Sequence, residues 1–181
     1  MPDVMLDIET LGTCPDCVVL TLGAVKFNPY AQEDIIAGIY CRPDVDEQIA
    51  KGRIVRDDTL EWWATQAEAV REEALGEEGR IPVTQMLQEL NRFLVGVNNI
   101  WAQGTVFDIG ILEHLYKQYN MVPNWQYWQI ADSRTLFKVH GDPREKNKEG
   151  LHNALEDCVS QAQGVQEIYR RQKIANSKFE N

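Results

Sequence analysis

A chain of 181 residues, 44% hydrophobic and 25% charged, is long enough to bury a core of its own, and we expect one domain over residues 1–172 followed by a polar, frayed tail at 173–181. It contains no apolar run of the roughly 18–20 residues that a membrane span needs and does not open on a basic segment followed by an apolar one, so we expect a cytoplasmic protein with no membrane partner. The net charge of −10 argues against a protein that coats long nucleic acid through a basic stripe. It still permits one that holds a chain end through bound cations, because these reverse the local field.

The first predicted element is a strand that ends on acidic residues. An apolar run at 4–6 leads into Asp7-Ile8-Glu9-Thr10 and stops at a glycine. Side chains two positions apart on a strand share a face, so Asp7 and Glu9 project together, opposite Leu6 and Ile8. Two adjacent carboxylates repel each other, and a hard divalent cation, Mg²⁺ or Mn²⁺, relieves that repulsion. The alternative is an edge strand whose acids face water.

Residues 11–43 continue as β structure. The run at 18–27 is rich in Val, Leu, Thr and Ala and predicts a second strand with its turn at 28–30, and 35–41 predicts a third strand that ends before Arg42-Pro43. These strands predict a three-stranded antiparallel meander. The loop between the first two strands holds Cys14-Pro15-Asp16-Cys17, whose spacing suits zinc or a redox dithiol. Because Cys41 and Cys158 are isolated and this pair lies in a turn, we expect reduced loop thiols.

Helices alternate with short strands after the meander. Asp57-Asp58-Thr59 supplies N-cap chemistry for a helix that carries Trp62 and Trp63, and the segment 57–79 holds many acids and the single base Arg71, as a solvated face does. Pro82 starts a helix with an apolar stripe over 83–94, and further helices are predicted from 107, from 133 and from near 152. Short strands are predicted at 99–102 and 128–131. The pattern indicates an α/β protein: a mixed sheet with helices on both faces.

Three more acidic or basic residues stand at element boundaries. Asp108 follows a strand and a glycine turn at the start of a helix, where the helix dipole favours a carboxylate. His152 and Asp157 open the last helix, and five residues of a regular helix leave them about 140° apart, so they converge only if His152 lies on the preceding loop, as Gly150 permits. Taken singly, Asp108 is equally an N-terminal helix charge and His152 a polar surface residue.

The ordered set Asp-x-Glu, Phe-Asp and His-x₄-Asp resembles the DEDDh branch of the 3′–5′ exonuclease superfamily, which includes ribonuclease T and oligoribonuclease. The resemblance extends from residue 4 to about 170. The segments 58–63 (DTLEWW) and 101–108 (WAQGTVFD) are similar to small phage-type and mycobacterial-type exoribonucleases, although Gln103 stands where many relatives have Asn. The fold that this resemblance implies is ribonuclease H-like, with the meander joined by short parallel strands.

The resemblance also implies an activity, its cofactors and its partner. The implied reaction is hydrolysis of single-stranded RNA or DNA from the 3′ end to nucleoside 5′-monophosphates with two Mg²⁺ or Mn²⁺ ions. Asp7, Glu9, Asp108 and Asp157 would hold the metals, and His152 would act as general base. The expected substrate contacts are Thr10, Leu11, Gly12, Trp62, Trp63, Gln103 and Phe107, with core packing as the alternative for the tryptophan pair. Several relatives are homodimers, so a homodimer is expected on the same ground.

Three questions stay open at this level. The chain could instead be a catalytically silent nucleic-acid-binding relative of the same fold, or a dithiol redox protein that uses Cys14 and Cys17. The choice between RNA and DNA depends on contacts to the 2′-hydroxyl. The basic residues between Arg134 and Lys148, especially Arg144, Lys146 and Lys148, are expected to form a flap beside the site, with a solvated surface loop as the alternative.

Overall fold

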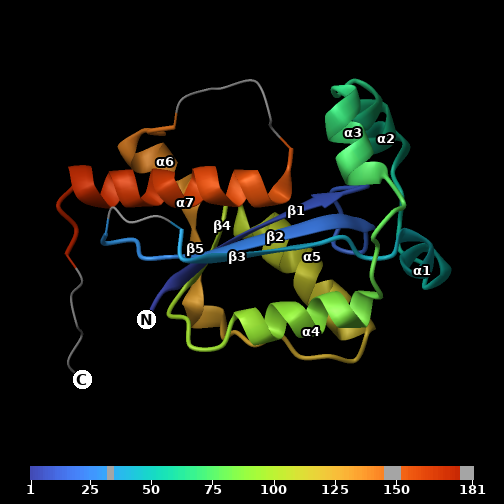
Figure 1. Cartoon of the computed structure of the whole chain (residues 1–181), viewed down its shortest axis with the longest axis horizontal. Coiled ribbons are helices and arrows are strands. Elements are labelled where there is room, and N and C mark those ends of the chain that lie inside the picture. Colours follow the sequence, from blue (N-terminus) through green and yellow to red (C-terminus); the bar gives the residue numbers. More distant parts are fainter. Residues whose placement is uncertain (32–34, 145–151, 176–181) are drawn as a thin grey trace.

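Five strands form one mixed sheet in the order β3-β2-β1-β4-β5 in the computed structural model, which describes residues 1–31, 35–144 and 152–175 (Figure 1). β1 (Asp3–Thr10) pairs antiparallel with β2 (Val19–Phe27), and β2 pairs antiparallel with β3 (Ala37–Cys41), which confirms the predicted meander. β4 (Ile100–Ala102) runs parallel to β1, and β5 (Ile130–Asp132) runs parallel to β4. The two short strands therefore bring their carboxyl ends to the edge at which β1 ends.

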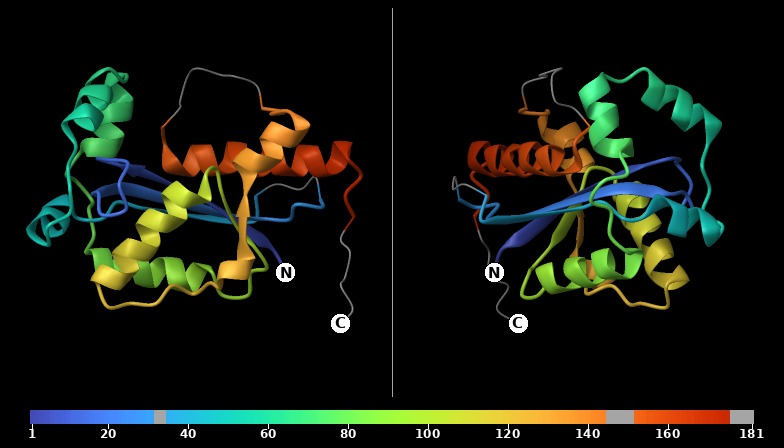
Figure 2. Two further views of the ribbon diagram at one scale, coloured as in Figure 1. Left: turned by 180° about the vertical axis from the view of Figure 1, so that it is seen from behind. Right: turned by 45° about the vertical axis from the view of Figure 1, so that its right-hand side comes forward.

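Helices cover both faces of this sheet, as predicted. α4 (Val83–Phe93) and α5 (Thr105–Gln118) lie on one face, and α6 (Ser133–His140) and α7 (Ala154–Arg171) lie on the other (Figures 1 and 2). α2 (Asp57–Ala64) and α3 (Glu68–Leu75) stand together at the end of the sheet to which β1 points. Among the described residues no helix is long and apolar enough to cross a bilayer.

The alternation along β1 decides which face carries the acids. Val4, Leu6 and Ile8 are buried in the core cluster that α4 and α5 complete, whereas Met5 is buried in the cluster that α6 and α7 complete. Because Asp7 and Glu9 share the parity of Met5, they lie on the face covered by α7. A third cluster, which contains Leu11, Leu20 and Trp63, fixes α2 and α3 against the sheet.

Two local predictions need correction. The strand expected at 128–131 begins later, because Tyr127–Gln129 form a 3₁₀ helix (η1) and only Ile130–Asp132 pair with β4. The sequence reading also missed α1 (Val45–Ala50), whose N-terminus is capped by Asp44 through the Glu47 N–H. A helix of 6 residues is too short to show an apolar stripe.

Candidate active site

Four carboxylates from three elements meet beyond the end of β1. Asp7 and Glu9 come from β1, Asp108 from the first turn of α5 and Asp157 from the first turn of α7. Asp108 is 3% exposed, and its Oδ1 accepts a hydrogen bond from the Ile8 backbone N–H at 3.2 Å, which ties α5 to β1. The parallel pairing of β4 with β1 brings α5 to this edge, where open α/β sheets place their ligands.

The four carboxyl groups lie close enough together for their charges to shift pKa values within the cluster. The pKa of Asp7 is raised well above its usual range, first by burial and then by the charges of Asp108, Glu9 and Asp157. Burial and the charges of Asp157 and Asp108 raise the pKa of Glu9 to about 8, and burial raises that of Asp108 to about 7. Because the cluster has an excess of acceptor oxygens and unfavourable negative charge, its chemistry fits hard divalent cations.

His152 satisfies the geometric condition that the sequence set for it. It lies before the Asn153 N-cap of α7 with a φ of 80°, off the helix, and its backbone N–H donates to Asp157 Oδ2 at 3.1 Å. The ligand atoms of Glu9, His152 and Asp157 all lie within 4.8 Å of one another. The imidazole also packs edge-on against Trp62, with ring centroids 4.7 Å apart. Gly150, which was expected to permit this loop conformation, lies outside the described residues.

The sequence did not predict one buried amide side chain of the cluster, that of Gln161. Gln161 is 4% exposed, and its Nε2 donates to Asp7 Oδ1 at 3.0 Å. Gln161 comes four residues after Asp157 on α7, so the two side chains share a helix face. This four-residue spacing from Asp157 is the sequence signal that could have identified Gln161. The hydrogen bond orients Asp7 and lowers its pKa against the larger effect of burial.

A pocket of about 400 Å³ opens beside the carboxylates. Of the predicted substrate contacts, Thr10, Gly12, Trp62 and Phe107 line it; its other lining residues are Ile8, Glu9, Thr13, Asp58 and Thr59. Trp62 is 40% exposed and so presents an aromatic face to this space. The pocket is large enough for one nucleotide, and it lies beside a carboxylate cluster whose chemistry fits a divalent cation.

Two predicted substrate contacts are buried instead. Leu11 is 5% exposed and Trp63 is 1% exposed, and both belong to the core beneath α2. Trp63 Nε1 donates to the Thr10 carbonyl at 2.9 Å, so this side chain acts on the pocket only by holding the pocket wall. The sequence could not separate Trp62 from Trp63, because neighbouring helical positions differ in burial only once the helix is docked.

The remaining predicted contact, Gln103, lies at a different place. It lines a smaller pocket of about 190 Å³ with Arg134, Lys138 and Arg144. Of the basic residues expected to form a flap, Arg134 and Lys138 lie on the helix α6 instead of a loop. Arg144 pairs with Asp142 at 2.7 Å, and its guanidinium lies 4.6 Å from the centre of the Phe137 ring. Lys146 and Lys148 lie outside the described residues.

The cysteine pair has the wrong properties for a redox dithiol. Burial raises the pKa of Cys17 to about 11, whereas a reactive thiol needs a lowered one. Cys17 Sγ donates to the Gly12 carbonyl at 3.3 Å, and Arg53, which is 4% exposed, donates to the carbonyls of Cys17 and Pro15 at 2.7 and 3.1 Å. Within the described part of the chain the cysteines join no cluster of metal-ligating side chains. This loop is a structural wall of the pocket.

The fold and the carboxylate cluster define the class of ribonuclease H-like exonucleases. The 3′-5′ exoribonuclease Rv2179c-like domain family matches residues 2–169, and the chain belongs to this family. It is 26% identical over 131 residues to the exodeoxyribonuclease of Enterobacteria phage T4, a match that covers 65% of this chain and 56% of the phage protein. The chain thus spans a little over half the length of that relative.

Solved structures show the same fold. A zinc-bound complex of E. coli exonuclease I with single-stranded DNA superposes with a TM-score of 0.67 and 14% identity over 95% of this chain and 41% of that one. Exonuclease X in complex with 5′ overhanging duplex DNA gives a TM-score of 0.60 and 12% identity, over 96% of this chain and 94% of that one. The chain spans about two fifths of the exonuclease I chain.

Proposed function

We propose that this chain is a metal-dependent 3′–5′ exonuclease that releases nucleoside 5′-monophosphates from the 3′ end of single-stranded RNA or DNA. The observation that carries the proposal is the meeting of Asp7, Glu9, Asp108 and Asp157 in one cluster, of which Glu9 also lines a nucleotide-sized pocket. Family membership supports the polarity of attack. The family is described for RNA and the phage relative for DNA, so both substrates enter the proposal.

In this proposal the four carboxylates hold two Mg²⁺ or Mn²⁺ ions. When bound, such ions lower the pKa of a water and neutralise charge on the leaving oxygen. The side chains of Trp62 and Phe107 flank the terminal base, and Thr10 and Gly12 contact its sugar through the pocket wall. His152, beside Glu9 and Asp157, takes the proton from the attacking water, a task that suits an imidazole at neutral pH.

The test is digestion of matched RNA and DNA oligonucleotides in Mg²⁺, Mn²⁺ or EDTA. Wild type should release mononucleotides stepwise with either metal and none in EDTA. Asp157→Asn should abolish release, whereas Glu156→Gln, its exposed neighbour in the same helical turn, should behave as wild type. Binding without release by wild-type protein in every metal would instead identify a catalytically silent relative. Comparison of the release rates from the two oligonucleotides determines whether the protein prefers RNA or DNA.

A homodimer stays an expectation from the relatives. Light scattering of the purified chain measures its mass directly against the 20.8 kDa of one copy.

A further inference from the structure

Two more pockets continue from the one beside the carboxylates. A pocket of about 370 Å³ shares Thr13 and Phe107 with it and is also lined by Pro15, Gly104, Val106, Ile111 and Arg134. Its volume falls within the roughly 300–1,000 Å³ of small-ligand sites. The smaller pocket along α6 shares Arg134 with it and adds Lys138, together with the paired side chains of Arg144 and Asp142. Neighbouring pockets thus share wall residues, which trace a path from Glu9 through Phe107 and Arg134 to Lys138, and Arg134 and Lys138 lie at the end away from Glu9.

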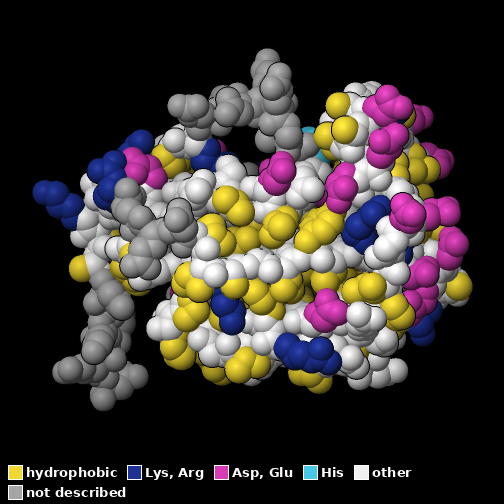
Figure 3. All heavy atoms as spheres, viewed as in Figure 1, with side chains coloured by type: hydrophobic (Ala, Val, Ile, Leu, Met, Phe, Trp, Pro, Cys, Tyr) yellow, Lys and Arg dark blue, Asp and Glu magenta, His cyan; other side chains and the backbone are white. Residues whose placement is uncertain are grey.

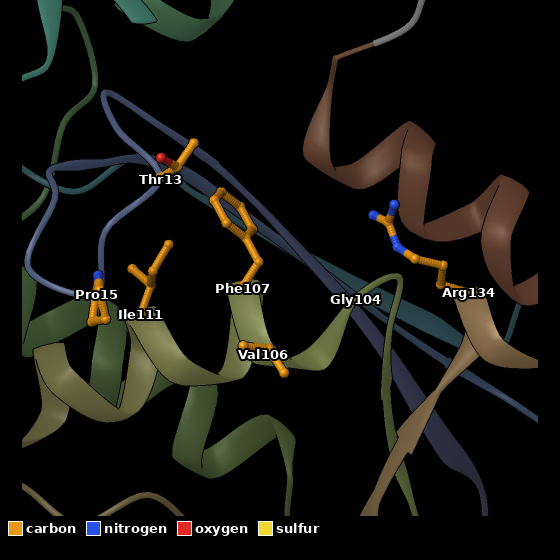
Figure 4. A pocket seen from close by; sticks show the side chains of 7 residues that line it. All are labelled: Thr13, Pro15, Gly104, Val106, Phe107, Ile111 and Arg134. Atoms are coloured by element: carbon orange, nitrogen blue, oxygen red, sulfur yellow. The ribbon is translucent and has the colours of Figure 1, made fainter.

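Arg134 is held in a fixed place on this path. Its Nη2 donates to the Gln103 carbonyl at 2.8 Å, and its guanidinium lies on the Gly104 turn, where an added Cβ would come within 3.1 Å of Nε and Nη2. Asp132 secures the same corner, because it accepts from the backbone N–H groups of Thr105 at 2.8 Å and Thr135 at 2.7 Å. Figure 4 shows the Phe107 ring and the Arg134 guanidinium on the same side of that turn, with Gly104 between them.

Arg134 lies outside the terminal-nucleotide pocket. It lines the neighbouring pocket of about 370 Å³, which shares Phe107 with the pocket beside the carboxylates, and Phe107 directly precedes Asp108 in the chain. If one phosphate of a nucleic-acid strand lies at the acids, the next phosphate of that strand comes within reach of the Arg134 guanidinium.

Negative charge disfavours a path for the substrate strand over α2 and α3. Acidic side chains gather over the end of the molecule formed by α1, α2 and α3 (Figure 3). Residues 57–79, which include α2, α3 and the turn after α3, carry Asp57, Asp58, Glu61, Glu68, Glu72, Glu73, Glu77 and Glu78. A polyanion that leaves the site over α2 and α3 would meet repulsion. The route over α6 offers Arg134 and Lys138.

We propose that the pocket between Phe107 and Arg134 receives the penultimate nucleotide of the substrate strand, with its base against Phe107 and its 5′-phosphate on Arg134. This inference rests on the proposed exonuclease function. Pro15, Val106 and Ile111 supply apolar walls for the base, and stacking on an aromatic ring tolerates any sequence. Arg134 is a positioning residue: it sets the register of the strand and does not touch the bond that is cleaved.

The decisive experiment compares a dinucleotide that lacks a 5′-phosphate with the same dinucleotide that carries one. In wild type the added phosphate should raise kcat/KM by about ten-fold, the scale of one charge-assisted hydrogen bond. Arg134→Gln should lose that gain, while Arg92→Gln, the same change on an exposed arginine of α4, should keep it. Retention of the gain in Arg134→Gln overturns the proposal, and so does an equal loss on both dinucleotides, which would place Arg134 on the cleaved phosphate.

A second variant tests the base pocket without touching the core. Val106 is 92% exposed, so Val106→Asp should fold normally and, by adding a negative charge, should raise KM for dinucleotides more than for the p-nitrophenyl ester of a nucleoside 5′-monophosphate. Val122→Asp, at a position 80% exposed and not among the pocket residues, is the control. Equal effects of Val106→Asp on both substrates would contradict the inference. No release from either dinucleotide by wild type would instead refute the exonuclease proposal itself.

Discussion

At the scale of single residues, His152 combines an unusual backbone with a confined side chain. Its φ of 80° is uncommon outside glycine, and its ring lies between Trp62 and the carboxylates of Glu9 and Asp157. The hydrogen bond from its N–H to Asp157 fixes this conformation. An imidazole held there can accept a proton from water at the cluster, and it is also near enough to bind an ion.

Replacement of His152 by Asn separates these two roles. Asn tolerates a positive φ, so the backbone should stay in place. If His152 is the general base, kcat should fall by about 10²–10⁴-fold and metal affinity should change little. Single-turnover hydrolysis and calorimetric metal titration measure the two quantities. A lost metal-binding event in the titration would identify His152 as a ligand.

The carboxylates at element boundaries were the site residues that the sequence could predict. Asp7, Glu9, Asp108 and Asp157 stand at element boundaries with characteristic spacing, and the structure brings them together. Gln161 and Arg53 were missed because their partners, Asp7 and the Cys17 carbonyl, are 154 and 36 residues away. Leu11 and Trp63 are buried in the cluster that fixes α2 and α3, which the sequence could not show because their burial depends on how these helices pack against the sheet.

At the scale of elements, α2 buries Trp63 in the core and places the adjacent Trp62 at the pocket. Trp62→Ala should weaken binding of a single strand by about 1–3 kcal/mol and leave stability nearly unchanged, because its ring is 40% exposed. Trp63→Ala should instead cost about 3–5 kcal/mol of unfolding free energy. Fluorescence anisotropy in an Asp157→Asn background and urea unfolding provide the two readouts. The reverse pattern would contradict the assignment of the two rings.

Contact between β2 and α7 positions half of the site. A Cβ on Gly23 would come within 2.5 Å of the Ala154 backbone, so Gly23→Ala must push away the start of α7, which carries Asp157. We expect a loss of about 1–3 kcal/mol in stability and a large fall in mononucleotide release. Gly110→Ala is the matched control: its Cβ would meet nothing within 4 Å, and it should stabilise α5 by about 0.4–1 kcal/mol. Normal turnover by Gly23→Ala would show that α7 tolerates displacement.

Long, periodic elements were predictable, as was the short strand β4, whereas α1 and the start of β5 were not. α4 carries its apolar stripe at Val83, Met86, Leu87 and Leu90 as expected, and the meander followed from β-rich runs separated by turns. α1 has no stripe and depends on its cap, while η1 and β5 share a segment whose pairing is decided by β4. The close approach at Gly23 is likewise a tertiary fact that no local pattern contains.

At the scale of the whole molecule, acidic and basic side chains are unevenly distributed over the surface. The start of α7, which carries Asp157, lies between α6 with its basic residues and the acidic end formed by α1–α3 (Figure 1), so a protein with a net charge of −10 still has basic residues on one side of the site. Composition alone could exclude a basic stripe but could not locate these basic residues. The domain bounds 1–172 stay a prediction, and residues 176–181 of the expected tail lie outside the described residues.

The carboxylate cluster also makes stability depend on pH and metal. In metal-free protein the pKa of Glu9 is raised from 4.5 to about 8 and that of Asp108 to about 7, so the folded state binds more protons than the unfolded state between about pH 4.5 and 8. Stability in EDTA should therefore fall as pH rises through this window. Mg²⁺ binds the deprotonated cluster, and it should raise the unfolding midpoint more at pH 8 than at pH 5.

Thermal unfolding of wild type and Asp7→Asn tests this expectation. Asp7→Asn removes one charge from the cluster, so in EDTA it should be more stable than wild type at pH 8 by about 4 °C or more, less so at pH 5, and should gain little from Mg²⁺. Glu156→Gln removes an exposed charge from the same end of α7 and should follow the wild-type curve. A wild-type midpoint in EDTA that climbs from pH 5 to pH 8 would show that the acids are not mutually repelling. The metal-site proposal would then lose its electrostatic basis.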